Sequence, residues 1–173
     1  MNLPNKITTL RLLLVPIYVG VFLYTDARIL ATLLFSIAAM TDFLDGYLAR
    51  KMGLVTDLGK LLDPLADKIL TISSFVLFVS IGRLSAVPVI IVITRELFIS
   101  IFRAIAAGKQ HVIAASVYGK TKTILQISLL ITLHLYWLMG RQTDMILQIL
   151  VWAMTAITLF SALDYLWKNR EVL

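Results

Sequence analysis

The sequence predicts an all-α integral membrane protein in which six transmembrane helices follow a short amphipathic N-terminal segment. Of its 173 residues, 60% are hydrophobic, and its mean hydropathy of +0.91 is too high for a soluble globular protein. Apolar runs of about 20 residues recur between polar breaks, which is the pattern of membrane-spanning helices. The length suits one domain, so we expect residues 1–173 to form a single unit.

The amphipathic segment is expected over residues 2–11. Pro4 suits a first helical turn, and Asn5, Thr8 and Arg11 share one side of a helix with a 3.6-residue period. Such a segment is expected to lie in the membrane interface before the chain turns inward. The apolar run after it lacks the small-residue cleavage site of a signal peptide, so we expect it to remain as a helix.

Six apolar spans are expected. Pro16 is expected to kink the first of them, and Gly53 to break the chain between the second and the third. Thr56 or Asp57 suits the N-cap of the third span. The first span is expected to end near residue 24, and the other five to cover residues 29–50, 57–81, 88–107, 120–139 and 144–167.

Lysine and arginine are distributed unevenly between the two ends of these spans. Only Arg28, Arg83 and Arg141 lie in the turns on one side. Because cytoplasmic loops carry the excess of basic residues, both termini are expected in the cytoplasm. The same bias accounts for the net charge of +6 without a nucleic-acid partner. The eleven basic residues on the other side are Lys6, Arg11, Arg50, Lys51, Lys60, Lys68, Lys109, Lys120, Lys122, Lys168 and Arg170.

Five of the ten acidic residues fall between positions 42 and 67. Asp42 and Asp45 are spaced i,i+3, and Asp63 and Asp67 are spaced i,i+4, so each pair shares one face of a helix. Carboxylates at the edge of an apolar medium are costly unless something compensates their charge. Four carboxylates suit Mg²⁺ or Mn²⁺ and carry enough charge for two ions, whereas a chain without cysteine has no thiolate site.

The residues around the two aspartate pairs suit a substrate that carries phosphate. Gly46 and Ala49 are small enough for a phosphate or a neighbouring helix to approach closely, and Arg50 can form a bidentate phosphate contact. The predicted topology also brings Arg103 and Lys120 to the depth of the aspartates. Paired metal ions with basic residues nearby indicate phosphoryl transfer.

One motif spans both aspartate pairs, and it resembles the signature of the CDP-alcohol phosphatidyltransferases, with all eight fixed positions met. Residues 2–11, 94–96 and 119–126, together with Arg103, resemble the branch of that family whose acceptor is sn-glycerol 3-phosphate. The motif reads Asp42-x2-Asp45-Gly46-x2-Ala49-Arg50-x8-Gly59-x3-Asp63-x3-Asp67.

The resemblance implies a homodimeric enzyme of the bacterial cytoplasmic membrane, with its active site facing the cytoplasm. It implies transfer of the phosphatidyl group of CDP-diacylglycerol to glycerol 3-phosphate, with release of CMP. Asp42, Asp45 and Asp63 would ligate the metal ions, and Asp67 would be both a ligand and the general base. The matching positions for CDP-lipid binding are Asn5, Thr8, Gly46, Ala49, Arg50, Thr56 and Gly59.

The phosphate of the acceptor needs cations that the metal site cannot supply. Some candidates also have a structural interpretation: Glu96 is expected to pair with an arginine, for which Arg95 is suited, and His134 is expected to be a hydrogen-bonded residue within a span. Lys120 and Lys122 also suit positive-inside anchors. Lipid headgroups are the expected partners of Lys51, Lys60 and Lys68. The first choices for the acceptor phosphate are Arg103 and Lys120, followed by Arg95, Lys109 and Lys122.

Two alternatives stay open. The first is a sibling enzyme whose acceptor is inositol phosphate, serine or phosphatidylglycerol, because the aspartate motif does not discriminate between acceptors. The second is a divalent-cation transporter with an acidic vestibule. Transporters usually hold their ions near the bilayer midplane on broken helices, whereas these aspartates are predicted at one face and beside Arg50.

Overall fold

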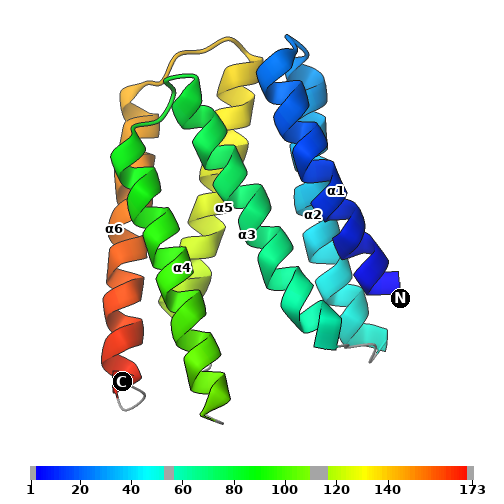
Figure 1. Cartoon of the computed structure of the whole chain (residues 1–173). Coiled ribbons are helices and arrows are strands. Elements are labelled where there is room, and N and C mark those ends of the chain that lie inside the picture. The colour runs from blue at the N-terminus through cyan, green and yellow to red at the C-terminus, as the bar shows by residue number, and fades with distance from the viewer. Residues whose placement is uncertain (1–2, 53–56, 110–116, 171–173) are drawn as a thin grey trace.

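The computed structural model is entirely helical over the residues that it describes, which are 3–52, 57–109 and 117–170. Side chains are described for residues 7–41, 65–106, 108–109 and 118–170. The helix bounds agree with the predicted spans to within a few residues, except at the N-terminus. The six helices are α1 (Leu3–Tyr24), α2 (Arg28–Met52), α3 (Asp57–Ser80), α4 (Ala86–Gly108), α5 (Val117–Leu138) and α6 (Met145–Lys168) (Figure 1).

The prediction of a separate amphipathic segment at the N-terminus is wrong. Its residues form the first turns of α1, which continues through Pro16 as one helix. Thr8 and Arg11 are both 0% exposed, and Arg11 Nε donates to Thr41 Oγ1 on α2 at 3.5 Å. The polar side of this segment therefore faces the neighbouring helices, because α1 packs against α2 and α3.

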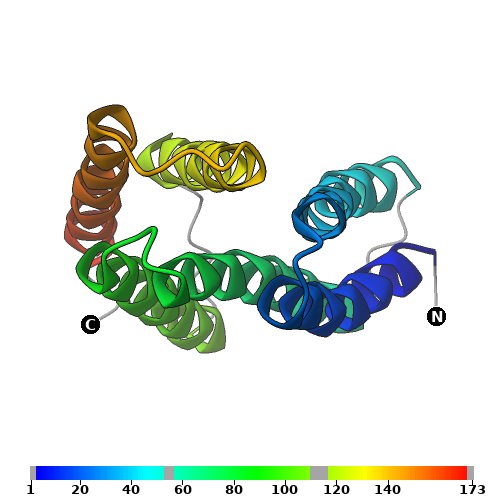
Figure 2. The same cartoon turned by 90° about the horizontal axis from the view of Figure 1, so that it is seen from above.

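The helix α3 runs through the middle of the bundle and contacts α1, α2, α4 and α5. Figure 2 shows α1 and α2 beside one part of α3, and α4, α5 and α6 beside the other. The chain direction alternates from each helix to the next, so α1 begins and α6 ends at the lower end of the bundle in Figure 1. The start of α3, the end of α4 and the start of α5 therefore share this lower end.

Turns and caps at the upper end follow from local sequence. Gly82 after α3 and Gly140 after α5 have φ values of 69° and 68°, a conformation that glycine adopts without steric cost. At each turn the glycine N–H and the following N–H bond back to carbonyls near the helix end, which is a Schellman motif. Asp144 caps α6 by accepting from the Leu147 N–H at 2.9 Å, and this bond and the Tyr136 hydroxyl lower the pKa of Asp144.

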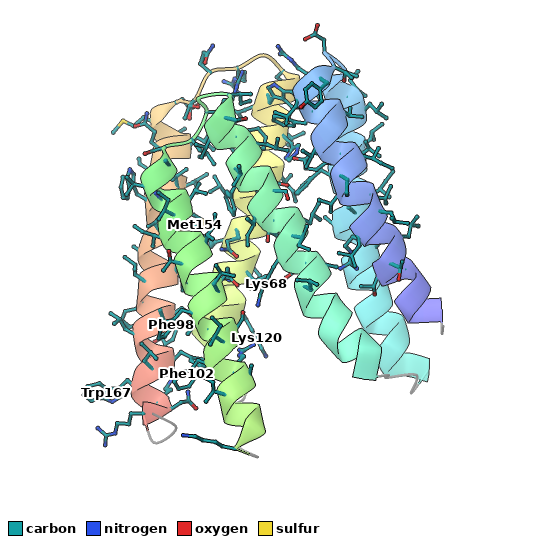
Figure 3. The ribbon with its side chains drawn as sticks, viewed as in Figure 1. Lys68, Phe98, Phe102, Lys120, Met154 and Trp167 are labelled. Carbon is teal, nitrogen blue, oxygen red and sulfur yellow. The ribbon has the colours of Figure 1, made fainter. Side chains whose placement is uncertain are left out.

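The main apolar core lies in the upper half, where rings from α1, α2, α3 and α5 meet. Phe22 stacks on Trp137 with ring centroids 4.2 Å apart, and Phe35 stacks on His134 at 4.1 Å. Phe78 contacts Phe22 and His134 edge-on. Large rings in such arrangements contribute strongly to packing. A smaller cluster joins α4 to α6 near Phe102, which Figure 3 labels; its members are Ile99, Phe102, Ala106 and Tyr165.

A hydrogen bond within this core leads to a stability prediction. The Tyr18 hydroxyl lies 3.0 Å from His134 Nε2, and His134 Nδ1 lies 2.8 Å from the Leu130 carbonyl, so the prediction of a hydrogen-bonded His134 is confirmed. Tyr18→Phe removes one partner and is expected to destabilise the protein by about 0.5–1.5 kcal/mol. Chemical unfolding in detergent measures this, with Tyr24→Phe as a control because Tyr24 is 87% exposed. Equal stability of the two variants would contradict the prediction.

Apolar side chains also cover the outer surface of the bundle. Leu13 on α1, Ile101 on α4 and Leu163 on α6 are all more than half exposed. Soluble monomers rarely expose so much apolar surface, whereas lipid solvates it. Within the described residues, two helical stretches are long and apolar enough to cross a membrane, Ile7–Tyr24 and Met145–Lys168.

Candidate active site

A cavity of about 680 Å³ opens between α3, α4 and α5. Figure 3 shows Lys68 and Lys120 in this lower half of the bundle, between α3 and the α4–α5 pair. The cavity has a strong excess of positive charge, which suits an anionic ligand. Among the described residues, its charged lining consists of two acidic residues, Asp67 and Glu96, and five basic residues, Lys68, Arg95, Arg103, Lys120 and Lys122.

The order of the helices explains why these side chains meet. Asp67 lies just before the middle of α3, Arg103 in the last third of α4 and Lys120 near the start of α5. Because neighbouring helices run in opposite directions, these positions can meet at the cavity. The sequence predicted that Asp67 would lie at the same depth as these cations, and the cavity brings them together.

Glu96 holds two of the five cations. Its Oε1 forms ion pairs with Arg95 Nη1 at 3.3 Å and with Lys122 Nζ. Lys122 is only 4% exposed, and Arg95 also donates to Ser161 Oγ on α6 at 2.8 Å. The predicted pairing of Glu96 with Arg95 is confirmed, and the structure adds Lys122 as a second partner. These bonds connect α4 to α5 and α6, so we call Glu96, Arg95 and Lys122 the Glu96 cluster.

The other three cations have no carboxylate partner among the described residues. Arg103 Nε donates to the Tyr165 hydroxyl at 3.1 Å, and its guanidinium lies 5.4 Å from the centre of the Tyr165 ring. Lys68 Nζ donates to Ser100 Oγ on α4. Lys120 is exposed at the cavity. Positive charge is therefore available to a ligand from three different helices.

Asp67 is the one predicted metal ligand whose side chain the structure describes. It is half-buried at the cavity, on the turn of α3 where the Thr71 hydroxyl donates to the Asp67 carbonyl at 3.0 Å. Asp42 lies just past the middle of α2, Asp45 in its last third and Asp63 in the second turn of α3, but their side chains are outside the described residues. These parts of α2 and α3 both lie at the lower end of the bundle (Figure 1).

The chemistry of these donors fits a hard divalent cation. All four are carboxylates, which are the ligands that Mg²⁺ and Mn²⁺ prefer. The described histidine is unsuited as a further ligand, because His134 lies in the upper core with both ring nitrogens engaged. The set of Asp42, Asp45, Asp63 and Asp67 is therefore compatible with such an ion, and Asp67 would join it to the cavity.

The residues predicted to bind a CDP-lipid are only partly described. Thr8 is fully buried on α1, on the same side as Arg11. Thr56 lies outside the described residues. Five further positions belong to helices, but nothing is described of their side chains: Asn5 on α1, Gly46, Ala49 and Arg50 on α2, and Gly59 on α3.

The structure differs from the sequence interpretation at three basic residues. Lys109 follows the end of α4 and is not among the residues that line the cavity. Lys68, which we had expected at lipid headgroups, lines the cavity and bonds to Ser100. Arg11, on the polar side of the predicted N-terminal segment, is fully buried next to Thr41. The sequence feature that could have predicted this burial is the three-residue spacing of Thr8 and Arg11, which places both polar side chains on one face of an otherwise apolar helix.

The fold and the cavity define a class of helical, membrane-embedded protein with a basic, carboxylate-bearing site toward one end of the bundle. The chain belongs to the CDP-alcohol phosphatidyltransferase family, whose model matches residues 1–162. This family is membrane-embedded and generally uses divalent metal ions.

Several bacterial relatives are similar over nearly the whole chain, and all three described here are named CDP-diacylglycerol–glycerol-3-phosphate 3-phosphatidyltransferase. The protein of Bacillus subtilis strain 168 is 36% identical, over 99% of this chain and 97% of its own. That of Haemophilus influenzae is also 36% identical, over 95% of this chain and 91% of its own. The protein of Rickettsia bellii is 34% identical, over 95% of this chain and 93% of its own.

Proposed function

We propose that this protein transfers the phosphatidyl group of CDP-diacylglycerol to sn-glycerol 3-phosphate, giving phosphatidylglycerophosphate and CMP. Membership of the family and the names of the relatives support this reaction. The single observation that carries the choice of acceptor is the cavity, in which Asp67 shares one space with cations that no described carboxylate neutralises. A phosphorylated alcohol offers the two groups that such a cavity suits, a hydroxyl for the carboxylate and a phosphate for the cations.

The proposed site holds two divalent ions, either Mg²⁺ or Mn²⁺. Their ligands would be Asp42, Asp45, Asp63 and Asp67. When bound, these ions would neutralise the pyrophosphate of the CDP-lipid and favour in-line displacement at phosphorus. The CDP-lipid would contact Asn5, Thr8, Gly46, Ala49, Arg50, Thr56 and Gly59, with the guanidinium of Arg50 on phosphate oxygens.

Asp67 takes the proton of the acceptor in the proposed reaction. The 1-hydroxyl of glycerol 3-phosphate attacks the phosphorus that carries the diacylglycerol, and the bond from this phosphorus to the CMP oxygen breaks. The hydroxyl proton passes to the Asp67 carboxylate, which is a general-base role. The half-buried position of Asp67 at the cavity supports this assignment.

The phosphate of the acceptor would bind at the cations of the cavity. Arg103 and Lys120 are the first choices, and Arg95 and Lys122 follow because Glu96 already engages them. Lys109 comes last, because it is not part of the cavity lining. Lys68, Arg103 and Lys120 also argue against a cation transporter, because they would repel an ion that moved along the cavity beyond the aspartates.

We also propose a single domain of six membrane spans, with both termini and the cavity at the cytoplasmic side of a bacterial cytoplasmic membrane. The apolar outer surface supports this topology, and so do the start of α1 and the end of α6, which both lie at the basic end of the bundle. A homodimer is proposed from the family resemblance. Cysteine-accessibility labelling at Asp26 and Lys168 tests the orientation, because these positions belong to opposite ends.

The reaction is tested by offering purified protein CDP-diacylglycerol with glycerol 3-phosphate, inositol phosphate, serine or phosphatidylglycerol in parallel. We expect CMP release only with glycerol 3-phosphate. CMP release with serine alone would overturn the assigned acceptor while leaving the family chemistry intact. A parallel reaction without divalent ions is the control, because it measures any CMP release that does not depend on the proposed metal site.

Replacing Arg103 by alanine is expected to raise KM for glycerol 3-phosphate about tenfold to a hundredfold. The reason is the loss of a charge-assisted hydrogen bond, whose contribution is about 1.5–3 kcal/mol. KM for CDP-diacylglycerol should change little, because this lipid is assigned to other residues. Initial rates with each substrate varied in turn measure both constants, with Arg170→Ala as a control at an exposed arginine beside Trp167. An equal rise in both KM values would instead indicate a structural role for Arg103.

A further inference from the structure

The five cations of the cavity divide into two groups by their partners. Arg95 and Lys122 share the carboxylate of Glu96, and both are largely buried. Lys68, Arg103 and Lys120 face the same cavity without a described carboxylate partner, and they come from α3, α4 and α5 respectively. The first group is already neutralised in part, so the second group carries most of the positive charge that a ligand would meet.

Lys68 is fixed in place although no described carboxylate pairs with it. Its ammonium donates to Ser100 Oγ, and the Ser100 hydroxyl in turn donates to the Glu96 carbonyl at 2.5 Å. Ser100 lies one turn of α4 before Arg103 and one turn after Glu96. This chain of bonds therefore holds the Lys68 ammonium against α4, next to the part of that helix that carries Arg103.

Lys68 is also the residue that directly follows Asp67. Neighbouring side chains leave an α-helix about 100° apart, but Asp67 and Lys68 both line the cavity, so one acceptor bound there can contact both side chains. Its reacting hydroxyl would lie at Asp67 and its phosphate at Lys68. One turn of α3 would then fix both ends of the acceptor relative to each other.

We infer that Lys68 binds the phosphate of the acceptor and sets the preference for a phosphorylated alcohol, as the third cation beside Arg103 and Lys120. This inference rests on the proposed function and deepens it. A phosphate monoester carries close to two negative charges at neutral pH and three strong acceptor oxygens, which matches three cations from three helices. The Glu96 cluster then has a positioning role, because it holds α4 and α5 together behind these cations.

The test compares Lys68→Met with Lys68→Arg and with Lys168→Met as a matched control. Lys168 is an exposed lysine at the same end of the bundle, paired with Asp164 on α6. Calorimetry measures the binding of sn-glycerol 3-phosphate to each full-length protein in Mg²⁺ buffer, with glycerol as the ligand that lacks phosphate. Initial rates of CMP release then give KM and kcat for both substrates.

For Lys68→Met we expect the Kd and KM for glycerol 3-phosphate to rise at least tenfold, with KM for CDP-diacylglycerol unchanged. Lys68→Arg should restore part of the affinity because it keeps the charge, and Lys168→Met should behave like the wild type. Ser100→Ala, which frees the Lys68 ammonium, should raise Kd by a smaller factor. This last variant keeps the test decisive if Lys68→Met does not fold.

Unchanged glycerol 3-phosphate binding in Lys68→Met would overturn the inference, and so would an equal rise of KM for both substrates. For Ser100→Ala, an unchanged Kd would contradict it as well. A wild-type protein that binds glycerol 3-phosphate but releases no CMP would refute the proposed function, while the binding role of Lys68 would still be measured by calorimetry. A wild-type protein that does not bind glycerol 3-phosphate would overturn both.

Discussion

Replacing Asp67 by asparagine is expected to lower the rate of CMP release by about 10²- to 10⁴-fold, which is the usual contribution of a general base. Asparagine keeps the size of the side chain and one oxygen, but it cannot accept the proton of the acceptor hydroxyl. Affinity for glycerol 3-phosphate should be largely retained, because the cations of the cavity are unchanged. Single-turnover release of CMP from labelled CDP-diacylglycerol is the measurement.

The matched control is Asp164→Asn, which removes an aspartate of α6 that pairs with Lys168 at 2.8 Å. This i,i+4 pair at the end of a helix contributes little to stability, and Asp164 does not line the cavity. Its turnover should stay near the wild-type rate. If Asp67→Asn also turned over at that rate, the proton would have to leave by another route, and Asp67 would not be the base.

Replacing Glu96 by glutamine is expected to have the largest effect on stability, a loss of about 3–5 kcal/mol, because it leaves buried cations without their counter-charge. Lys122 is 4% exposed, and Arg95 Nε already has no hydrogen-bond partner among the described residues. The two cations would then repel each other between α4 and α5. Denaturant or thermal unfolding in detergent measures the loss.

A double variant separates this charge effect from a general loss of packing. Combining Glu96→Gln with Lys122→Met removes both partners of the ion pair, so most of the lost stability should return. If the double variant were as unstable as the sum of the two single changes, the Glu96 cluster would not be held by charge pairing. Turnover of the double variant also reports whether the cluster positions Arg103 and Lys120.

Helix boundaries, and the meeting of Asp67 with Lys120 in one cavity, were predictable from the sequence because they depend on local patterns. Gly82 and Gly140 end helices through a conformation that glycine readily adopts. The i,i+4 spacing of Asp63 and Asp67 and the alternating direction of the spans placed Asp67 at the end that carries Lys120. Such inferences need only the helical period and the distribution of basic residues.

The partners of individual side chains were less predictable, because they depend on how neighbouring helices are rotated against each other. Lys68 follows Asp67 by one residue, and only the packing of α3 on α4 shows that its ammonium reaches Ser100. The pairing of Glu96 with Lys122 similarly depends on the register of α4 against α5. The continuity of the N-terminal segment with α1 was likewise not predicted, because its polar residues Thr8 and Arg11 are buried in the bundle, where Arg11 bonds to Thr41 of α2.

Product analysis of one reaction tests the central claim most directly. Purified wild-type protein receives CDP-diacylglycerol, glycerol 3-phosphate and Mg²⁺, and mass spectrometry and nucleotide chromatography quantify the lipid and nucleotide products. We predict one molecule of phosphatidylglycerophosphate for each CMP, and formation of both products about 10²- to 10⁴-fold slower with Asp67→Asn. Release of CMP together with phosphatidic acid, with the glycerol 3-phosphate unconsumed, would show hydrolysis by water and contradict the proposed transfer.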